Sequence, residues 1–122
     1  MDKEENGKRV YDLEERTAMF AKRCRELIRV VPRTVTNRED AKQLARCSGS
    51  VAANYLEANA ALGKKDFQMR VRIPRKEAKE SKLFLRLLYT DNTDAQEMER
   101  TALVQEATEL ISIFGAILRK SE

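Results

Sequence analysis

The chain has 122 residues, a length that suits one domain with a single hydrophobic core. Its 36% charged and 6% aromatic residues are typical of amphipathic helices rather than sheets, and its 42% apolar residues are enough to form a core. The net charge of +4 is too small, taken alone, to indicate a nucleic-acid ligand. Composition therefore predicts one all-α domain.

Several catalytic arrangements are excluded by what the sequence lacks. It contains no histidine, which removes the commonest general base and the Glu-x-x-His pairs of di-iron bundles. No glycine-rich phosphate loop is present. The two cysteines, Cys24 and Cys47, form no CxxC motif and are expected to be reduced thiols in the core. We therefore expect a protein that is not an enzyme and that holds neither a cofactor nor a metal ion.

The ends of the chain predict a cytoplasmic protein with no membrane partner. Residues 1–9 are polar and lack the apolar region of a signal peptide. No run approaches the roughly 18 apolar residues that a membrane-spanning helix needs. Residues 1–10 and 120–122 are expected to be flexible tails on either side of a bundle over residues 11–119.

Four segments repeat apolar or small residues at alternating spacings of four and three, the period of a helix with one buried face. The expected helices span residues 11–31, 37–62, 64–89 and 94–119. Their predicted core positions are Leu13, Thr17, Phe20, Cys24, Leu27 and Val31; Leu44, Ser48, Val51, Tyr55, Ala58 and Leu62; Phe67, Val71, Pro74, Ala78, Ser81, Leu85 and Leu88; and Leu103, Ala107, Leu110, Phe114 and Ile117. Short polar breaks between them predict an antiparallel, up-down-up-down four-helix bundle.

Local signals mark the expected helix ends. Thr36 with Glu39, and Thr93 with Gln96, have the spacing of a capping box. Gly63 suits the left-handed position that follows a helix.

The stretch from residue 67 to residue 73 has a second possible interpretation. It alternates apolar and polar residues as a half-buried strand does, but nothing else in the chain alternates and could pair with it. Pro74 then interrupts the third helix, where it removes a hydrogen bond. We prefer a helix that is kinked near Arg70 to Pro74.

Positive charge is concentrated on the third segment. It carries nine basic side chains against three acidic ones, a local charge of +6. A stripe of this kind can follow a phosphate backbone without reading bases, which predicts RNA or DNA binding. The alternative is a solvated face that is balanced by Glu97, Glu99, Glu106 and Glu109 of the fourth segment. The candidate binding residues are Lys64, Lys65, Arg70, Arg72, Arg75, Lys76, Lys79, Lys82 and Arg86.

A group of polar residues is expected to orient helices at the edge of the core. This predicted network contains Arg46, Asn54, Glu57, Glu77 and Glu80. The three carboxylates offer a weaker alternative, a site for a hard metal ion. Beside the network, the small residues of positions 47–53 would let neighbouring helices or subunits approach closely.

These same segments resemble a known family. The run from Arg46 to Ala58, followed by Lys64 to Phe67, Arg75 to Ser81 and Leu85 to Leu88, is similar to the 23S rRNA intervening-sequence proteins. The similarity covers about residues 11–88. Pro74 departs from the pattern, because relatives carry a small or apolar residue that is compatible with a helix there.

The resemblance implies an antiparallel four-helix bundle that assembles as a homopentamer. Some members of the family are encoded within insertions in 23S ribosomal RNA genes. A related branch, the accessory proteins of diversity-generating retroelements, binds reverse transcriptase and nucleic acid. We therefore expect a homo-oligomer that binds RNA or DNA. The alternative is a scaffold that docks a partner protein such as a polymerase or reverse transcriptase.

Overall fold

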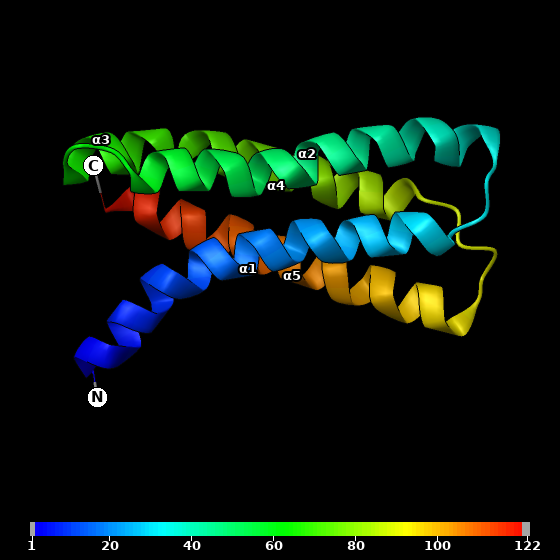
Figure 1. The fold of residues 1–122 in the computed structure, drawn as a ribbon, viewed down its shortest axis with the longest axis horizontal. Helices are drawn as coiled ribbons and strands as arrows, with labels where there is room; N and C mark the ends of the chain where they lie inside the picture. The colour runs from blue at the N-terminus through cyan, green and yellow to red at the C-terminus, as the bar shows by residue number, and fades with distance from the viewer. Residues whose placement is uncertain (1, 121–122) are drawn as a thin grey trace.

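Helices make up all the regular secondary structure of the computed structural model (Figure 1), which describes the backbone of residues 2–120 and the side chains of residues 13–120. The predicted all-α class is confirmed. The helices are α1 (Asp2–Val30), α2 (Val35–Asn59), α3 (Lys64–Arg70), α4 (Arg72–Leu87) and α5 (Asp94–Arg119). Residues 67–73 contain no strand, so the alternative interpretation of that stretch is wrong.

The first helix begins earlier than expected, at Asp2 rather than near residue 11. The flexible tails predicted for residues 1–10 and 120–122 fall largely outside the described side chains.

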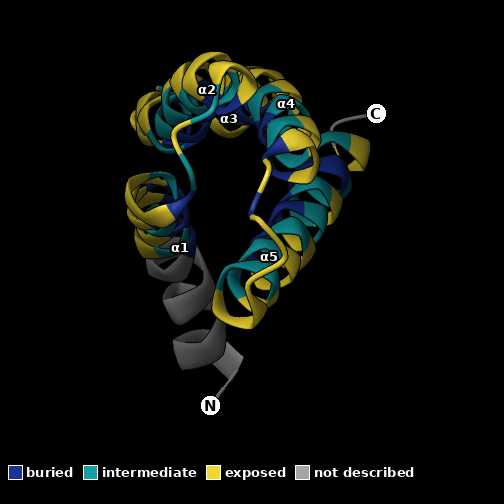
Figure 2. Cartoon of the chain, turned by 90° about the vertical axis from the view of Figure 1, so that its right-hand side faces the viewer, coloured by how far each residue is buried: buried dark blue, intermediate teal, exposed yellow. Residues whose placement is uncertain are grey.

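Four helices surround the core (Figure 2). In order around it, α1 packs against α2, α2 against α4, α4 against α5, and α5 against α1. The buried positions of each helix face inward. Short α3 packs against α2, α4 and α5 at one end. The order follows the chain, so each long helix is covered by its neighbours in sequence.

The predicted core positions are buried with three exceptions. Phe67 and Ile117 are only partly buried and pack against the edge of the core. Leu62 is fully exposed, with 100% of its surface accessible, because α2 ends at Asn59 and the period no longer applies beyond it.

Tyr55 joins three helices at one end of the core. Its ring stacks on Phe114 of α5, with centroids 5.9 Å apart, and meets Phe67 of α3 edge-on at 6.2 Å. Such aromatic pairs add about 0.5–1.5 kcal/mol each beyond the burial of their area. The short α3 is therefore anchored to both α2 and α5 through one side chain.

The third predicted helix is interrupted at Val71, which separates α3 from α4. Pro74 explains the position of the break, because its nitrogen cannot donate to the carbonyl of Arg70 and its ring crowds that carbonyl. The bonds on either side survive: Val71 N donates to Phe67 O and Arg75 N donates to Val71 O, both at 3.2 Å. The proline thus lies in the first turn of α4, where a missing N–H is tolerated.

Both predicted capping boxes are wrong in detail. The N-cap of α2 is Thr34, whose hydroxyl accepts the N–H of Asn37 at 3.1 Å, and not Thr36. Thr93 is the N-cap of α5, but its side chain makes no capping bond. Gln96 instead donates to the carbonyl of Val30 at 2.9 Å and so links α5 to the end of α1.

Buried Asn37 ties two loops together. Its amide nitrogen donates to Pro32 O at 2.8 Å and to Tyr89 O at 2.7 Å, and its oxygen accepts the N–H of Tyr89 at 2.8 Å. Pro32 precedes α2 and Tyr89 follows α4. One side chain therefore satisfies backbone groups of both loops at that end of the bundle.

By length and composition alone, α5 is apolar enough to cross a membrane, contrary to the sequence-based expectation. Its apolar residues Leu103, Ala107, Leu110 and Phe114 are instead fully buried in the core. A core helix of this kind meets the same two criteria.

Candidate nucleic-acid interface

The predicted basic residues divide between two helices. Lys64, Lys65 and Arg70 lie on α3, and the other six lie on α4. On α4 the buried positions Pro74, Ala78, Ser81 and Leu85 define the inner face. Five basic residues of α4 recur at the same alternating spacing of three and four. They lie on a different side of the helix from the buried positions: Arg72, Arg75, Lys79, Lys82 and Arg86.

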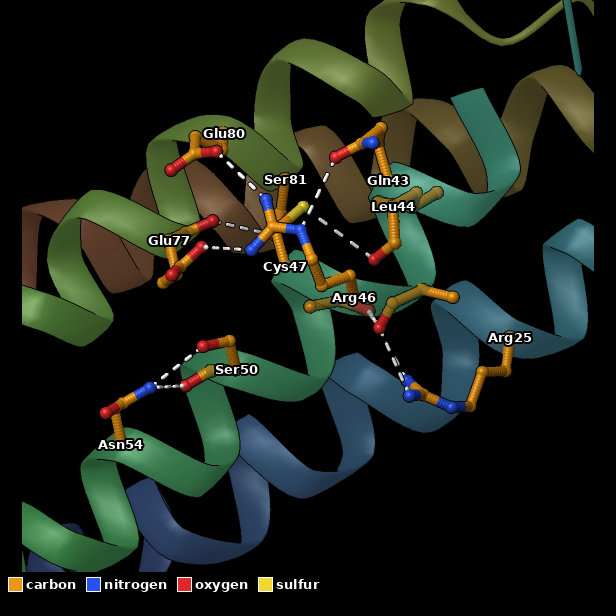
Figure 3. Close-up of polar contacts among 12 residues, drawn as sticks. Arg25, Gln43, Leu44, Arg46, Cys47, Ser50, Asn54, Glu77, Glu80 and Ser81 are labelled. Carbon is orange, nitrogen blue, oxygen red and sulfur yellow. Dashed lines mark hydrogen bonds and ion pairs between the residues drawn. The ribbon is translucent and has the colours of Figure 1, made fainter. Parts of the chain in front are cut away.

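The basic flank of α4 is the one next to α5. The guanidinium of Arg75 donates from Nε to the carbonyl of Ile111, across the boundary between the helices, at 3.4 Å. The opposite flank is acidic. Glu77 and Glu80 lie beside α2, where both bind Arg46 at 3.5 and 3.1 Å (Figure 3). Charge on α4 is thus sorted by flank, with acids toward α2 and bases toward α5.

The four glutamates of α5 form their ion pairs away from this basic flank. Glu106 and Glu109 contact Arg16 of α1 at 2.6 and 3.3 Å, and Glu99 contacts Arg23 of α1 at 3.0 Å. The hydrogen bonds that Arg23 donates to the Glu99 carboxylate raise the pKa of Arg23.

The fourth glutamate, Glu97, pairs with Arg100 of its own helix, and this bond lowers the pKa of the Glu97 carboxyl. The ion pairs described for these four glutamates therefore do not involve the basic residues of the stripe.

Within residues 13–120, one of the nine predicted binding residues forms an ion pair. Arg70 contacts Asp66 at 3.0 Å, and both side chains are about half exposed. The other eight form none in that part of the chain. They place positive charge along α3 and α4 that no described carboxylate pairs with directly.

A hollow of about 450 Å³ lies where this basic surface meets α5. Arg72, Arg75, Lys76 and Lys79 line it from α4, and Arg119 lines it from the last turn of α5. Gly115 and Leu118 complete the lining, and none of the lining residues within residues 13–120 is acidic. We call this the α4–α5 hollow. Arg119 was missed from the sequence because it is distant from the basic segment along the chain.

A second basic hollow, of about 380 Å³, lies at the junction of α1 and α2. Its cations come from both sides of Pro32: Arg29, Arg33, Arg38 and Lys42. No single segment shows this cluster, because the loop divides it between two helices. Only the folded chain brings the four together.

The predicted polar network forms in part (Figure 3). Arg46, Glu77 and Glu80 meet between α2 and α4. Asn54 does not join them, because its amide donates locally to the carbonyl and hydroxyl of Ser50, at 2.9 and 2.8 Å. Glu57 is exposed, and its side chain takes part in none of the hydrogen bonds or ion pairs described for residues 13–120.

The metal alternative gains no support from this arrangement. Among the described side chains, no three carboxylates or thiols lie close enough together to hold an ion. Both cysteines are buried, as predicted for core thiols. Cys47 accepts a hydrogen bond from Ser81 of α4 at 3.3 Å, beside the Arg46 cluster. Burial raises the pKa of both thiols, that of Cys24 to about 12, so neither is a ready nucleophile at neutral pH.

Comparison with known proteins gives one informative likeness. No protein-family model and no curated protein matches this chain. A crystal structure of a protein of unknown function from the S23 ribosomal protein family, from Bacteroides thetaiotaomicron VPI-5482, is 26% identical. The match covers 87% of this chain and 97% of that one, with a TM-score of 0.69. The likeness supports a family-level relation. To that extent the resemblance seen in the sequence is confirmed.

Proposed function

We propose that this chain is a non-enzymatic, cytoplasmic bundle that binds RNA or DNA without sequence specificity through the basic face of α3 and α4. The observation that carries the proposal is which side chains the acidic residues of α4 and α5 bind. The four glutamates of α5 bind α1 or α5 itself, and Glu77 and Glu80 bind Arg46 of α2. The flank of α4 next to α5 therefore keeps its positive charge.

The spacing of the stripe suits a polyanion rather than a single base. Arg72, Lys79 and Arg86 recur every seven residues, which places them about 10 Å apart along a helix. Lysine and arginine side chains that contact phosphates release counterions and so bind in a salt-dependent manner. Such contacts position the ligand but do not read its sequence.

The proposal includes an antiparallel, up-down-up-down order of the four helices. Its support is Figure 1, in which the chain turns back after α1, after α2 and after α4. In that order the last turn of α5 lies beside the first turn of α4, as the lining of the α4–α5 hollow requires.

We further propose that the bundle is a homo-oligomer, in which several copies of the basic face act together. The support is a set of exposed apolar side chains on α4, at positions outside its buried face. Ile73, Leu83 and Leu87 have 49%, 46% and 53% of their surface accessible. A ring of weak sites gains avidity when one polyanion spans several of them.

A second proposal, a scaffold that docks a partner protein, has an observation of its own. A hollow of about 410 Å³ between α1 and α2 is lined by Glu14 and Glu15 and by five small or apolar residues: Ala18, Gly49, Ala52, Ala53 and Leu56. Such a groove suits an apolar helix of another protein. Binding of a polymerase-like partner without nucleic acid would favour this proposal over the first.

A salt titration tests nucleic-acid binding. We expect generic single-stranded RNA to bind at low salt, with the logarithm of affinity falling linearly as the logarithm of salt concentration rises. A variant with Arg72→Gln, Lys79→Gln and Arg86→Gln should bind about 10-fold or more weakly and show a shallower salt slope. Fluorescence anisotropy measures both quantities, and circular dichroism checks that helicity is retained.

The matched control changes the second basic hollow by the same charge. Arg29, Arg38 and Lys42 are exposed, as the three stripe residues are, and we expect their replacement by Gln to leave most of the affinity. An equal loss in both variants would place binding outside the stripe. No binding at low salt would overturn the proposal altogether.

A further inference from the structure

We infer that the α4–α5 hollow is a pocket for one phosphate group, a defined site within an otherwise diffuse basic face. The inference deepens the proposed function by naming the ligand group that this part of the face holds, and it rests on that function only for the source of the phosphate. The groups that could contact the anion come from two helices that converge on one hollow.

The composition of the lining favours an anion over any other small ligand. Five cations surround about 450 Å³: Arg72, Arg75, Lys76, Lys79 and Arg119. None of the five forms an ion pair within residues 13–120. A phosphate with part of its hydration shell fits this volume, given that a liquid water occupies about 30 Å³. Arginine forks bind phosphate oxygens in pairs, and lysines add point charges.

Gly115 allows the guanidiniums to approach the backbone of α5. A Cβ at this position would lie 3.2 Å from Nε of Arg75 and 3.3 Å from an Nη of Arg119, tighter than ordinary contact. The absent side chain thus leaves space that both arginines use. A hydrogen bond to α5 also positions the Arg75 side chain, because its Nε donates to Ile111 O at 3.4 Å. A guanidinium fixed in this way needs little reordering to bind a ligand.

A similar arrangement elsewhere in the bundle shows what a purely structural arginine looks like. Arg25 of α1 lies over Gly49 of α2, where a Cβ would be 2.9 Å from its Nη2. It donates to the carbonyls of Ala21 and Ala45, at 3.2 and 3.1 Å, and reaches the hydroxyl of Ser48 at 3.5 Å.

The guanidinium of Arg75, by contrast, makes one hydrogen bond among the described residues, to the carbonyl of Ile111, four residues before Gly115. A guanidinium carries five N–H donors. The guanidinium of Arg25 donates to groups of the bundle itself, whereas most N–H donors of the Arg75 guanidinium are available to a ligand.

Inorganic pyrophosphate is the probe for this pocket. We expect isothermal titration calorimetry at low salt to show one pyrophosphate bound per α4–α5 hollow. Replacement of Arg75 and Arg119 by Gln should weaken binding by about 10- to 100-fold, the usual effect of losing charge-assisted bonds. The matched control is Lys64→Gln with Arg86→Gln, which removes equal charge from the same basic face but lies outside the hollow. It should change affinity less than about threefold.

Gly115→Ala provides a third variant that alters space and not charge. The added methyl group should displace both guanidiniums and weaken pyrophosphate binding, while thermal unfolding checks that the bundle still folds. Absence of pyrophosphate binding to the intact protein, or an equal loss in the pocket variant and the Lys64/Arg86 control, would overturn the pocket.

Paired RNA ligands identify the source of the phosphate and separate this inference from the proposed function. Preference for a 5′-monophosphate RNA over its 5′-hydroxyl twin, lost in the Arg75/Arg119 variant, would assign the pocket to a terminal phosphate. Equal binding of the two RNAs, weakened by the same variant, would assign it to a backbone phosphate. RNA binding without pyrophosphate binding would refute the pocket alone. Pyrophosphate binding without RNA binding would refute nucleic acid as the source and keep the pocket.

Discussion

Two glycines inside long helices show how a single residue sets the approach of a neighbour. Gly49 and Gly115 each leave room for an arginine of the adjacent helix, which donates to the carbonyl four residues earlier. In an isolated helix a glycine costs about 1 kcal/mol relative to alanine. Here the missing methyl group is used by Arg25 in one case and by Arg75 in the other. The sequence around each glycine does not predict this contact, because the arginine comes from another helix.

The buried thiol of Cys24 makes stability depend on pH. Burial raises its pKa from 9.0 to about 12, so the folded state favours the protonated form. The stabilisation is complete below pH 9 and is lost as pH rises toward 12, because the unfolded chain releases its proton first. We expect the stability advantage of the wild type over Cys24→Ala to shrink between pH 8 and pH 10.5 in urea unfolding.

Leu110→Ala is the control for this effect, because it opens the core without removing a titrating group. Its destabilisation should stay constant over the same pH range. A constant difference for Cys24→Ala as well would show that the thiol does not contribute to the pH dependence.

At the scale of the element, helix period was predicted more accurately than helix ends. The bounds of α5 agree with the expected 94–119, whereas α2 ends at Asn59 and not at residue 62. Period depends on many residues that share a buried face, so one deviation does not obscure it. The end of a helix depends on one or two hydrogen bonds. At the start of α2, Thr34 and Thr36 are both suitable N-cap residues by sequence, so the local pattern does not decide between them.

The cap of α2 gives a prediction at this scale. Thr34→Ala removes the bond to the N–H of Asn37 and should lower the free energy of unfolding by about 1 kcal/mol. Thr36→Ala, two residues away on the exposed surface, should change it by less than about 0.5 kcal/mol. Chemical denaturation of the two variants decides between the caps. A larger loss for Thr36→Ala would restore the cap expected from the sequence.

For the molecule as a whole, the decisive feature is how the flanks of each helix are paired. The four long helices form a ring in which acidic flanks meet arginines of α1 and α2. The basic flank of α4 meets an α5 surface of Ile111, Gly115 and Leu118 instead. A net charge of +4 therefore understates the field on one side of the molecule.

The proposed assembly is tested at the same scale. We expect light scattering to give a mass that is a multiple of the chain mass. Ile73→Glu with Leu87→Glu should dissociate the assembly, because each places a charge at an exposed apolar position of α4. Val35→Glu with Met98→Glu, also at exposed apolar positions but on other helices, should leave the mass unchanged. A monomeric wild type would refute the homo-oligomer.

The sequence by itself determined the all-α class, most of the core positions, the interruption near Pro74 and the concentration of charge on α3 and α4. Each depends on residues close together in the chain, where helical period and backbone chemistry act. Only the tertiary structure decided which flank faces which neighbour. It turned Glu99 and Glu106 toward α1 and brought Arg119 to Arg75, because the pairing of side chains across helices depends on rotation and order that no local pattern contains.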